Sequence, residues 1–275
     1  MKQRAPVRPK KFLGQHFLAD ENIARRIVDS LEPPVGVVHV LEIGPGTGVL
    51  TKYLLEDDRF TTFAMEVDDE SIAYLLQHYP QLEGRLFHAD FLKADLEALL
   101  PGSFALIGNF PYNISSQILF RMLDFKDRIP VLTGMFQKEV AERIASGPGN
   151  RDYGILSVLL QPWYDIAYLF TVDEKDFIPP PRVKSGVIRM LRNNRKQLRC
   201  DPDFFRRLVK TGFGQRRKTL RNALRPLLPS DISAIPYLDL RAEALSWQQF
   251  EELAMLLQGN VPPSMQPENQ AGNHI

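Results

Sequence analysis

The sequence has one cysteine, no long hydrophobic run and no secretory signal, and each absence excludes a class of protein. With Cys200 as the only cysteine, an intramolecular disulfide framework and a multi-cysteine zinc site are excluded. No run approaches the roughly 18 apolar residues that a membrane span requires. The basic N-terminus is not followed by an apolar segment either. We therefore expect a cytoplasmic protein that neither spans a membrane nor uses a metal.

Charge is distributed unevenly along the 275 residues, which are enough for one large domain and a smaller one. Residues 1–12 carry five Lys or Arg and no acid, whereas residues 182–225 carry fifteen against Asp201 and Asp203. Subtracting +5 and +13 from the net charge of +1 leaves −17 for the rest of the chain. Two basic segments on an acidic body favour a polyanion bound at defined surfaces, although a solvated basic face has the same composition.

Short apolar runs alternate with helical segments over the first half of the chain. The runs lie at residues 37–43, 60–67, 85–89, 104–108 and 130–136. This alternation predicts an α/β domain with a mostly parallel sheet. Two later runs, 164–172 and 185–191, predict a hairpin at the edge of that sheet. Before the first strand, Asp20 is a candidate N-cap for a helix at 21–31.

The pattern changes after about Asp201, where three helical segments follow one another at residues 204–213, 216–228 and 246–258. The proline-rich stretch at 176–182 predicts a stiff loop. We therefore predict four parts, which are a flexible basic arm at 1–12, an α/β domain at 13–195, a helical domain at 196–258 and a disordered tail at 259–275.

A glycine loop, EIGPGTG at residues 42–48, follows the first strand of the predicted sheet. Glycines at Gly44 and Gly46 let a ligand approach the backbone, and the next helix offers free amides. Glu66 stands 22 residues after Gly44, at the end of the following strand, where an acid accepts hydrogen bonds from ribose hydroxyls. The G-x-G-x-G spacing favours S-adenosylmethionine, while an NAD dehydrogenase stays open as an alternative.

Two more strands also end in polar residues. Asp90 can accept hydrogen bonds from an adenine amine while Phe91 flanks the ring, although Asp90 could instead only cap the next helix. Asn109 ends the fourth strand. Because the carboxyl ends of parallel strands meet at one edge of a sheet, where such folds bind ligands, we expect these residues to lie near Gly44 and Glu66.

The loop Asn109-Phe-Pro-Tyr112 offers two hydrogen-bond acceptors beside an aromatic plane. Pro111 holds Phe110 in an extended conformation, so the Phe110 carbonyl has a set direction next to the Asn109 amide oxygen. This combination suits an exocyclic amine on a planar base, and the loop is similar to the N-[LIF]-P-Y loops of amino-group methyltransferases. The plainer alternative is that Asn109 caps a helix and Tyr112 packs at the edge of the core.

From about residue 10 to residue 257 the chain resembles the ribosomal RNA small-subunit adenine N6,N6-dimethyltransferase family. The resemblance rests on stretches that are jointly specific: KKFLGQHFL, LEIGPGTGVLT, HADFLK, GNFPYNIS, MFQKEVAERI, YGILSVL, FIPPPRVKS and FGQRRKTLRNAL. It implies a Rossmann-like class I methyltransferase sheet with a small C-terminal all-helical domain. It also implies a monomer that uses S-adenosylmethionine to methylate two adjacent adenosines in a hairpin near the 3′ end of 16S rRNA.

Individual roles follow from the motifs and the resemblance together. Contacts with the methyl donor are expected at His16, Leu18, Gly44, Gly46, Glu66, Asp90, Phe91 and Asn109. Catalysis is expected at Asn109, Phe110, Pro111, Tyr112 and Phe177, with Phe177 covering the second face of the base. Phosphates are expected on Lys10, Lys11, Arg216, Arg217, Lys218 and Arg221, with Arg217, Arg221 and Arg225 on one helical face. The chain departs from the family pattern at His16, Phe110 and Lys184, where Asn, Leu and Asp are usual.

Other readings of the same sequence use different features. A non-catalytic ribosome-assembly factor on this scaffold would not need Glu66, Asp90 and the intact N-F-P-Y loop. A DNA adenine methyltransferase would share that loop but would need a sizeable target-recognition domain. An NAD dehydrogenase leaves the loop and both basic segments unexplained.

Overall fold

The computed structural model describes residues 7–259, so residues 1–6 of the predicted arm and 260–275 of the predicted tail lie outside the described residues. Residues 7–12 of the predicted arm are described, and among them Val7 is buried and Lys10 pairs with Asp68. The chain divides into two compact units, Met1–Ala145 with Trp163–Asn193 and Ser146–Pro162 with Asn194–Ile275. The division differs from the predicted boundary at 195 in two respects, since the first unit already ends at Asn193. The segment Ser146–Pro162, placed by the prediction in the α/β domain, groups with the C-terminal helices.

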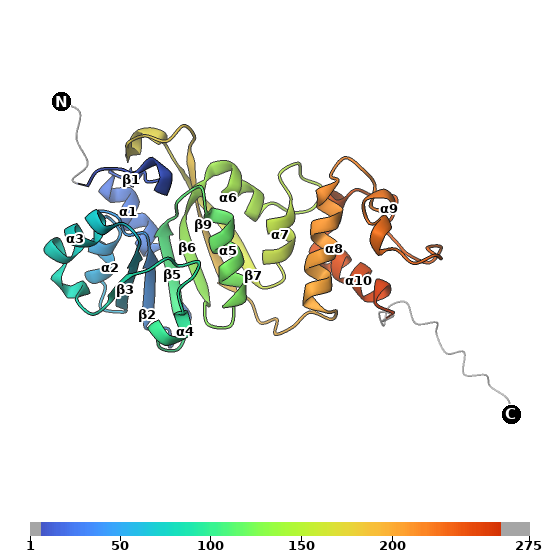
Figure 1. Ribbon diagram of the computed structural model, residues 1–275, viewed down its shortest axis with the longest axis horizontal. Helices are drawn as coiled ribbons and strands as arrows, with labels where there is room; N and C mark the ends of the chain where they lie inside the picture. Colours follow the sequence, from blue (N-terminus) through green and yellow to red (C-terminus); the bar gives the residue numbers. More distant parts are fainter. Residues whose placement is uncertain (1–6, 260–275) are drawn as a thin grey trace. The chain divides into compact units, whose positions relative to one another are not determined.

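Among residues 7–259, seven strands form the main sheet of the first unit, in the order β4-β3-β2-β5-β6-β9-β7 (Figure 1). Five of them run parallel, namely β2 His39–Ile43, β3 Thr61–Glu66, β4 Leu86–His88, β5 Phe104–Asn109 and β6 Val131–Gln137. Strand β9 Ser185–Arg192 pairs antiparallel with β6 and with the edge strand β7 Tyr164–Val172. The predicted α/β sheet with an antiparallel hairpin at one edge is therefore confirmed.

Helices cover both faces of this sheet, so its central strands are buried on both sides. The helices of the first unit are α1 Glu21–Asp29, α2 Thr51–Leu55, α3 Asp69–His78, α4 Leu96–Leu99, α5 Ser115–Asp124 and α6 Lys138–Ala145. As predicted, Asp20 caps α1, because its carboxylate accepts hydrogen bonds from the N–H groups of Asn22 (2.8 Å) and Ile23 (3.1 Å). Single turns of 3₁₀ helix occur at η1 Lys11–Leu13, η2 Pro80–Leu82 and η3 Glu174–Asp176.

A two-stranded sheet that the sequence did not predict joins β1 Phe17–Leu18 to β8 Phe177–Ile178 in antiparallel register. The stretch 176–182 was expected to be only a loop, but its first residues precede the prolines and keep N–H groups that can pair. Leu18 and Phe177 are register partners, and both are buried in the core cluster that contains Ile27. The pairing therefore holds the N-terminal segment against the main core.

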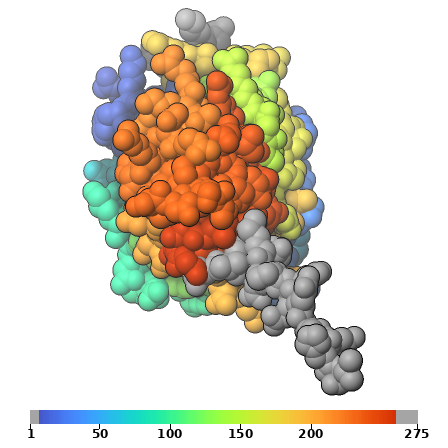
Figure 2. Space-filling model, turned by 90° about the vertical axis from the view of Figure 1, so that its right-hand side faces the viewer, coloured from blue at the N-terminus to red at the C-terminus, as the bar shows by residue number. Residues whose placement is uncertain are grey.

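The second unit is helical in the described residues, and Figure 2 shows the face formed by its orange and red residues. Its elements are α7 Ile155–Leu160, α8 Pro202–Gly214, α9 Leu220–Ala223, α10 Trp247–Leu257, and two 3₁₀ turns, η4 Arg225–Leu227 and η5 Ala242–Ala244. The buried carboxylate of Glu251 receives hydrogen bonds from Arg195 Nη1 (2.7 Å) and Arg199 Nε (2.8 Å). This pairing compensates for removing the charge from water.

One predicted helix of this unit is wrong. Residues 216–228 were expected to be helical, with Arg217, Arg221 and Arg225 on one face, but α9 is only four residues long. It begins after Thr219, which bridges to Arg241, and η4 with Pro226 follows it. Arg217 therefore precedes the helix and Arg225 lies beyond it, so the three arginines share no helical face.

None of the helices between residues 7 and 259 is long and apolar enough to cross a membrane.

Candidate active site

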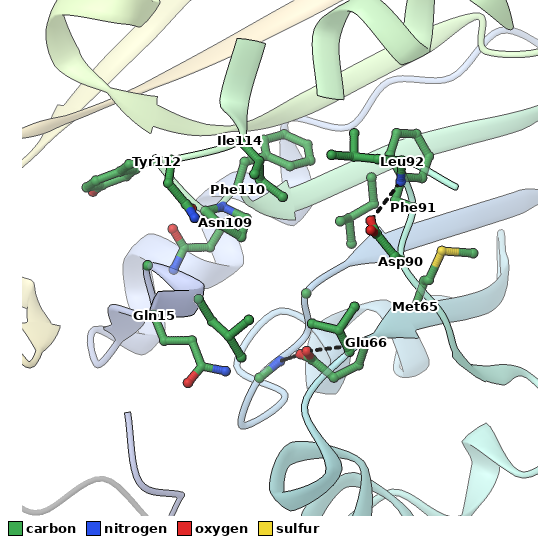
Figure 3. A pocket seen from close by; sticks show the side chains of 18 of the residues that line it. Gln15, Met65, Glu66, Asp90, Phe91, Leu92, Asn109, Phe110, Tyr112 and Ile114 are labelled. Carbon is green, nitrogen blue, oxygen red and sulfur yellow. Dashed lines mark hydrogen bonds between the residues drawn. The ribbon is translucent and has the colours of Figure 1, made fainter. Parts of the chain in front are cut away.

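A cavity of about 310 Å³ lies at the carboxyl ends of the parallel strands of the first unit (Figure 3). The four strand-end residues singled out in the sequence all line it, namely Gly44, Glu66, Asp90 and Asn109. Residues 13–17 of the N-terminal segment line it as well. Its volume is at the lower end of the range for small-molecule pockets, which is about 300–1,000 Å³.

The glycine loop gives this cavity a wall of bare backbone. Gly44 and Gly46 have φ values of 64° and 57°, a left-handed conformation that residues with a Cβ rarely adopt. A Cβ on Gly46 would also lie 2.7 Å from Cε1 of Phe17, whereas a Cβ on Gly44 would meet nothing within 4 Å. The space beside Gly44 is therefore open to a ligand.

Glu66 lies at the end of β3 and faces the same loop. Its carboxylate accepts hydrogen bonds from the N–H groups of Gly46 (3.1 Å), Val67 (2.8 Å) and Asp68 (3.0 Å). Burial raises the pKa of Glu66, and these three hydrogen bonds oppose that rise. The backbone thus fixes the direction of the carboxylate, which acts as a bridge between β3 and the glycine loop.

Asp90 and Phe91 follow β4, where Asp90 organises a turn. Its Oδ1 accepts a hydrogen bond from the N–H of Leu92 (2.9 Å), whereas the next helix, α4, is capped by Asp95 and not by Asp90. The other oxygen of Asp90, Oδ2, lies 3.6 Å from Lys93 Nζ, and both Asp90 and Phe91 line the cavity. One carboxylate oxygen therefore organises the turn, and the other lies beside the exposed Lys93 ammonium at the edge of the cavity.

The N-F-P-Y loop carries two acceptor oxygens that have no protein donor among the described residues. The Nδ2 of Asn109 donates a hydrogen bond to the His16 carbonyl (2.8 Å), so Oδ1 is the free end of the amide. Within residues 7–259, neither Asn109 Oδ1 nor the Phe110 carbonyl accepts a hydrogen bond from the protein. The Phe110 ring is buried against Phe136, with centroids 4.9 Å apart, and it occupies space left by Gly134.

Tyr112 is held by contacts at its hydroxyl and at its ring. The hydroxyl lies 2.5 Å from Ser185 Oγ, and the ring stacks on His16 with centroids 5.7 Å apart and planes 24° from parallel. Burial raises the pKa of the Tyr112 hydroxyl. The Nδ1 of His16 lies 2.9 Å from the carbonyl oxygen of Pro179. The histidine that replaces the usual Asn is therefore part of an aromatic pair at the rim of the cavity.

Two predicted site residues do not face this cavity. Leu18 is 3% exposed and Phe177 is 2% exposed, and both belong to the core of the first unit. The Phe177 ring is buried in this core and does not line the cavity, so its predicted role in covering the base stays a prediction. In this structure both residues hold the N-terminal segment against the core.

The predicted phosphate-binding cations fall into two groups. Lys10 forms ion pairs with Asp68 and with Glu70 (3.3 Å). Arg216 donates hydrogen bonds to the carbonyls of Arg151 and Tyr153, and Arg221 lies 2.9 Å from Asp239. Within residues 7–259, the side chains of the other three cations make no ion pair. They are Lys11, Arg217 and Lys218. Lys184, the departure from the family pattern, pairs with Asp173 (2.5 Å).

Several cavity residues were missed by sequence reasoning. They are Leu13, Gly14, Gln15, Phe17, Ile43, Met65, Val67, Ala89, Leu92, Asn113 and Ile114. Gln15 receives a hydrogen bond from the Lys10 N–H (2.8 Å), and its Nε2 lies 3.4 Å from Asp68 Oδ2. It stands in the GQ-x-FL stretch, which was a signal for this segment as a whole but gave no role to this side chain.

The strand order, the glycine loop and the polar strand ends define a Rossmann-like class I methyltransferase. A solved dimethyladenosine transferase from Plasmodium falciparum has the same fold, with a TM-score of 0.71 at 22% identity over 89% of this chain and 98% of that one. The chain belongs to the ribosomal RNA adenine dimethylase family, whose model matches residues 7–254. The resemblance found in the sequence is thereby confirmed.

Curated relatives agree over nearly the whole length. Ribosomal RNA small subunit methyltransferase A of Parabacteroides distasonis is 56% identical over 269 residues, covering 97% of this chain and 98% of the relative. The protein of the same name from Cytophaga hutchinsonii is 56% identical over 254 residues, covering 92% and 98%. The solved 23S rRNA methyltransferase ErmE has a TM-score of 0.64 at 25% identity, covering 86% of this chain and 99% of that one.

Proposed function

We propose that this chain transfers methyl groups from S-adenosylmethionine to the N6 amines of two adjacent adenosines in a 3′-terminal hairpin of 16S rRNA, giving N6,N6-dimethyladenosine. The observation that carries the proposal is the Asn109 amide, whose Nδ2 is tied to the His16 carbonyl while Oδ1 stays free at the cavity. Family membership and the names of the relatives support ribosomal RNA as the substrate. We further propose that the enzyme acts as a cytoplasmic monomer in small-subunit biogenesis.

The cavity fits S-adenosylmethionine by the chemistry of its walls. When bound, this cofactor would supply a methyl group activated on a sulfonium sulfur. The bare backbone at Gly44 admits a ligand, and Glu66 offers carboxylate oxygens suited to ribose hydroxyls. Asp90 and Phe91 offer an acceptor and a ring for an adenine. His16 and Gly46 lie in the same wall.

The N-F-P-Y loop would activate the target amine through acceptors alone. An adenine amine is a poor nucleophile because its lone pair is delocalised into the ring. Asn109 Oδ1 and the Phe110 carbonyl would accept hydrogen bonds from its N–H groups, of which there are two in the first transfer and one in the second. These bonds favour a pyramidal nitrogen and stabilise the positive charge that develops on it in the transition state, and the methylated nitrogen then releases one proton. Pro111 keeps these acceptors in place, since its ring restricts the backbone on both sides.

The aromatic residues would position the base. The target adenosine has to leave its stack to reach a cavity of this kind, and an aromatic face offsets part of that cost. The described structure offers the ring of Tyr112 as this aromatic face. Its hydroxyl contacts Ser185 and its ring stacks on His16. The protein's contribution is then orientation and the exclusion of water.

Phosphate contacts would hold the RNA without reading its sequence. In the first unit, Lys11 is exposed and has no ion-pair partner among residues 7–259. In the second unit, Arg217 and Lys218 are also exposed and have no ion-pair partner among residues 7–259. Lys10, Arg216 and Arg221 already have protein partners, so we propose a smaller share of phosphate binding for them.

The test supplies labelled S-adenosylmethionine and small ribosomal subunits from cells that lack the modification. The RNA is digested to nucleosides and examined for labelled N6,N6-dimethyladenosine, with Asn109→Ala as the site variant and Asn22→Ala, on the exposed start of α1, as the matched control. Label in that nucleoside with wild type and Asn22→Ala, and its loss in Asn109→Ala, is the expected result. Tight subunit binding without any transfer would favour an assembly factor instead.

A further inference from the structure

A second hollow in the first unit, with a volume of about 990 Å³, adjoins the cavity. Five residues line both spaces, and they are Gly14, Gln15, His16, Tyr112 and Asn113. The stacked pair of His16 and Tyr112 is thus a shared wall. Any molecule in this outer groove lies directly beside whatever occupies the cavity.

The outer groove is lined by cations and by no acid among residues 7–259. Its charged members are Arg8, Lys11 and Arg182, which come from two segments far apart in the sequence. All three side chains are exposed, and none forms an ion pair or a side-chain hydrogen bond within the described part of the chain. Lys10 differs, because its ammonium is held by Asp68 and Glu70. The three groove cations are therefore available to an anion from outside.

Prolines and a valine form an apolar part of the outer groove. Pro179, Pro180 and Val183 line it and are exposed, with Val183 at 44%. Next to Lys11, the aromatic ring of Phe12 is 77% exposed. Cations along a backbone path beside flat apolar and aromatic surfaces are the combination that binds single-stranded nucleic acid.

We propose that this outer groove binds the single-stranded RNA nucleotides next to the target adenosine. Their phosphates would contact Arg8, Lys11 and Arg182, and their bases would lie against the proline face. An acidic peptide would also match the cations, but only a strand that continues into the cavity explains the shared wall of His16 and Tyr112. The inference rests on the proposed function, because it takes the occupant of the cavity to be a base of the same strand.

The experiment measures the salt dependence of RNA binding by the full chain. A fluorescein-labelled, adenosine-containing single-stranded RNA is titrated by anisotropy at several salt concentrations. The test variant carries Arg8→Gln, Lys11→Gln and Arg182→Gln. The control is Arg59→Gln, which removes one positive charge just before β3, at the opposite edge of the sheet from the cavity. Each lost phosphate contact reduces the magnitude of the slope of log affinity against log salt by about 0.7. The slope of the triple variant should therefore be smaller in magnitude by about 2.

The outcomes separate this inference from the proposed function. An unchanged slope in the triple variant, or an equal loss in Arg59→Gln, overturns the groove assignment. Failure of the wild type to methylate RNA, measured in parallel, overturns the proposed function, while a slope loss confined to the triple variant still supports an RNA site. Binding of S-adenosylhomocysteine should match wild type. If the triple variant binds S-adenosylhomocysteine more weakly than wild type, the salt titration is repeated with the single variant Arg182→Gln. Its slope of log affinity against log salt should then be smaller in magnitude by about 0.7.

Discussion

The Asn109 side chain donates a hydrogen bond through Nδ2 to the backbone carbonyl of His16, 2.8 Å away and 93 residues earlier in the chain. This bond joins the N-terminal segment to the end of β5 and decides which end of the amide is free. Because the donor is used, the acceptor oxygen is left for a ligand. The orientation of the N-F-P-Y loop therefore depends on a residue far from it in sequence.

Replacing Asn109 by Ala should lower kcat by about 10²–10³, since one preorganised hydrogen-bond partner of the reacting group is lost. Asn109→Asp should also be impaired, because it sets a carboxylate oxygen against the His16 carbonyl. Single-turnover methyl transfer measures these effects. Normal turnover in Asn109→Ala would show that the amide oxygen does not act on the amine.

Tyr112 separates stacking from hydrogen bonding. Tyr112→Phe keeps the ring and loses only the contact with Ser185, so RNA affinity should fall by roughly 2- to 10-fold. Tyr112→Ala also loses base stacking and should weaken RNA binding by roughly 5- to 150-fold. Equilibrium binding of an adenosine-containing RNA distinguishes the two. Equal affinities for the Phe and Ala variants would argue against a stacking role.

Glu42 should make the stability of the protein depend on pH. Burial raises the pKa of this carboxyl from 4.5 to about 8, although Thr51 Oγ1 donates a hydrogen bond to it (2.6 Å). The folded protein keeps the proton after the unfolded chain has released it. The free energy of unfolding should therefore fall as pH rises from 4.5 through about 8, by at most about 1.4 kcal/mol per pH unit.

Glu42→Gln should remove this contribution, because a neutral amide has no proton to lose. Urea unfolding at about pH 6 and about pH 8.5 should show a smaller loss of stability in the variant than in wild type. The exposed Glu83→Gln serves as the control and should follow wild type. Parallel pH profiles for all three proteins would mean that Glu42 is ionised in the fold.

Gly134 leaves room for the ring of Phe110. A Cβ at Gly134 would lie 2.3 Å from Phe110 Cε2 and 2.6 Å from the Gly108 carbonyl oxygen. Gly134→Ala should therefore cost about 1–3 kcal/mol of stability through overpacking and should also lower kcat by moving the Phe110 carbonyl. Thermal unfolding and turnover would be measured beside Gly147→Ala, whose added Cβ meets nothing within 4 Å. Similar results for both variants would contradict this account.

The features that sequence could predict are those encoded locally or by repetition. Continuous apolar runs predicted the parallel strands, because strands that are buried on both faces show that pattern. The order of the chain then placed Gly44, Glu66, Asp90 and Asn109 at one edge of the sheet, where the cavity lies. The helix start at Asp20 follows from a side chain that bonds two nearby amides.

The features that escaped prediction depend on contacts between distant segments. The β1–β8 pairing involves two residues from each strand, too few for a periodic signal, and it buries Phe177. Lys10 and Lys11 look equivalent in sequence, yet only Lys10 reaches Asp68. The short α9 reflects the bridge from Thr219 to Arg241, which local propensity does not show.

The grouping of Ser146–Pro162 with the C-terminal helices means that the chain passes between its two units three times, after Ala145, Pro162 and Asn193. Neither unit is one continuous stretch. A truncation at residue 195 would keep α7 but remove α8, against which it packs. Exchanging the helical unit between relatives would thus require three coordinated splice junctions, which favours inheritance of the two units as a single module.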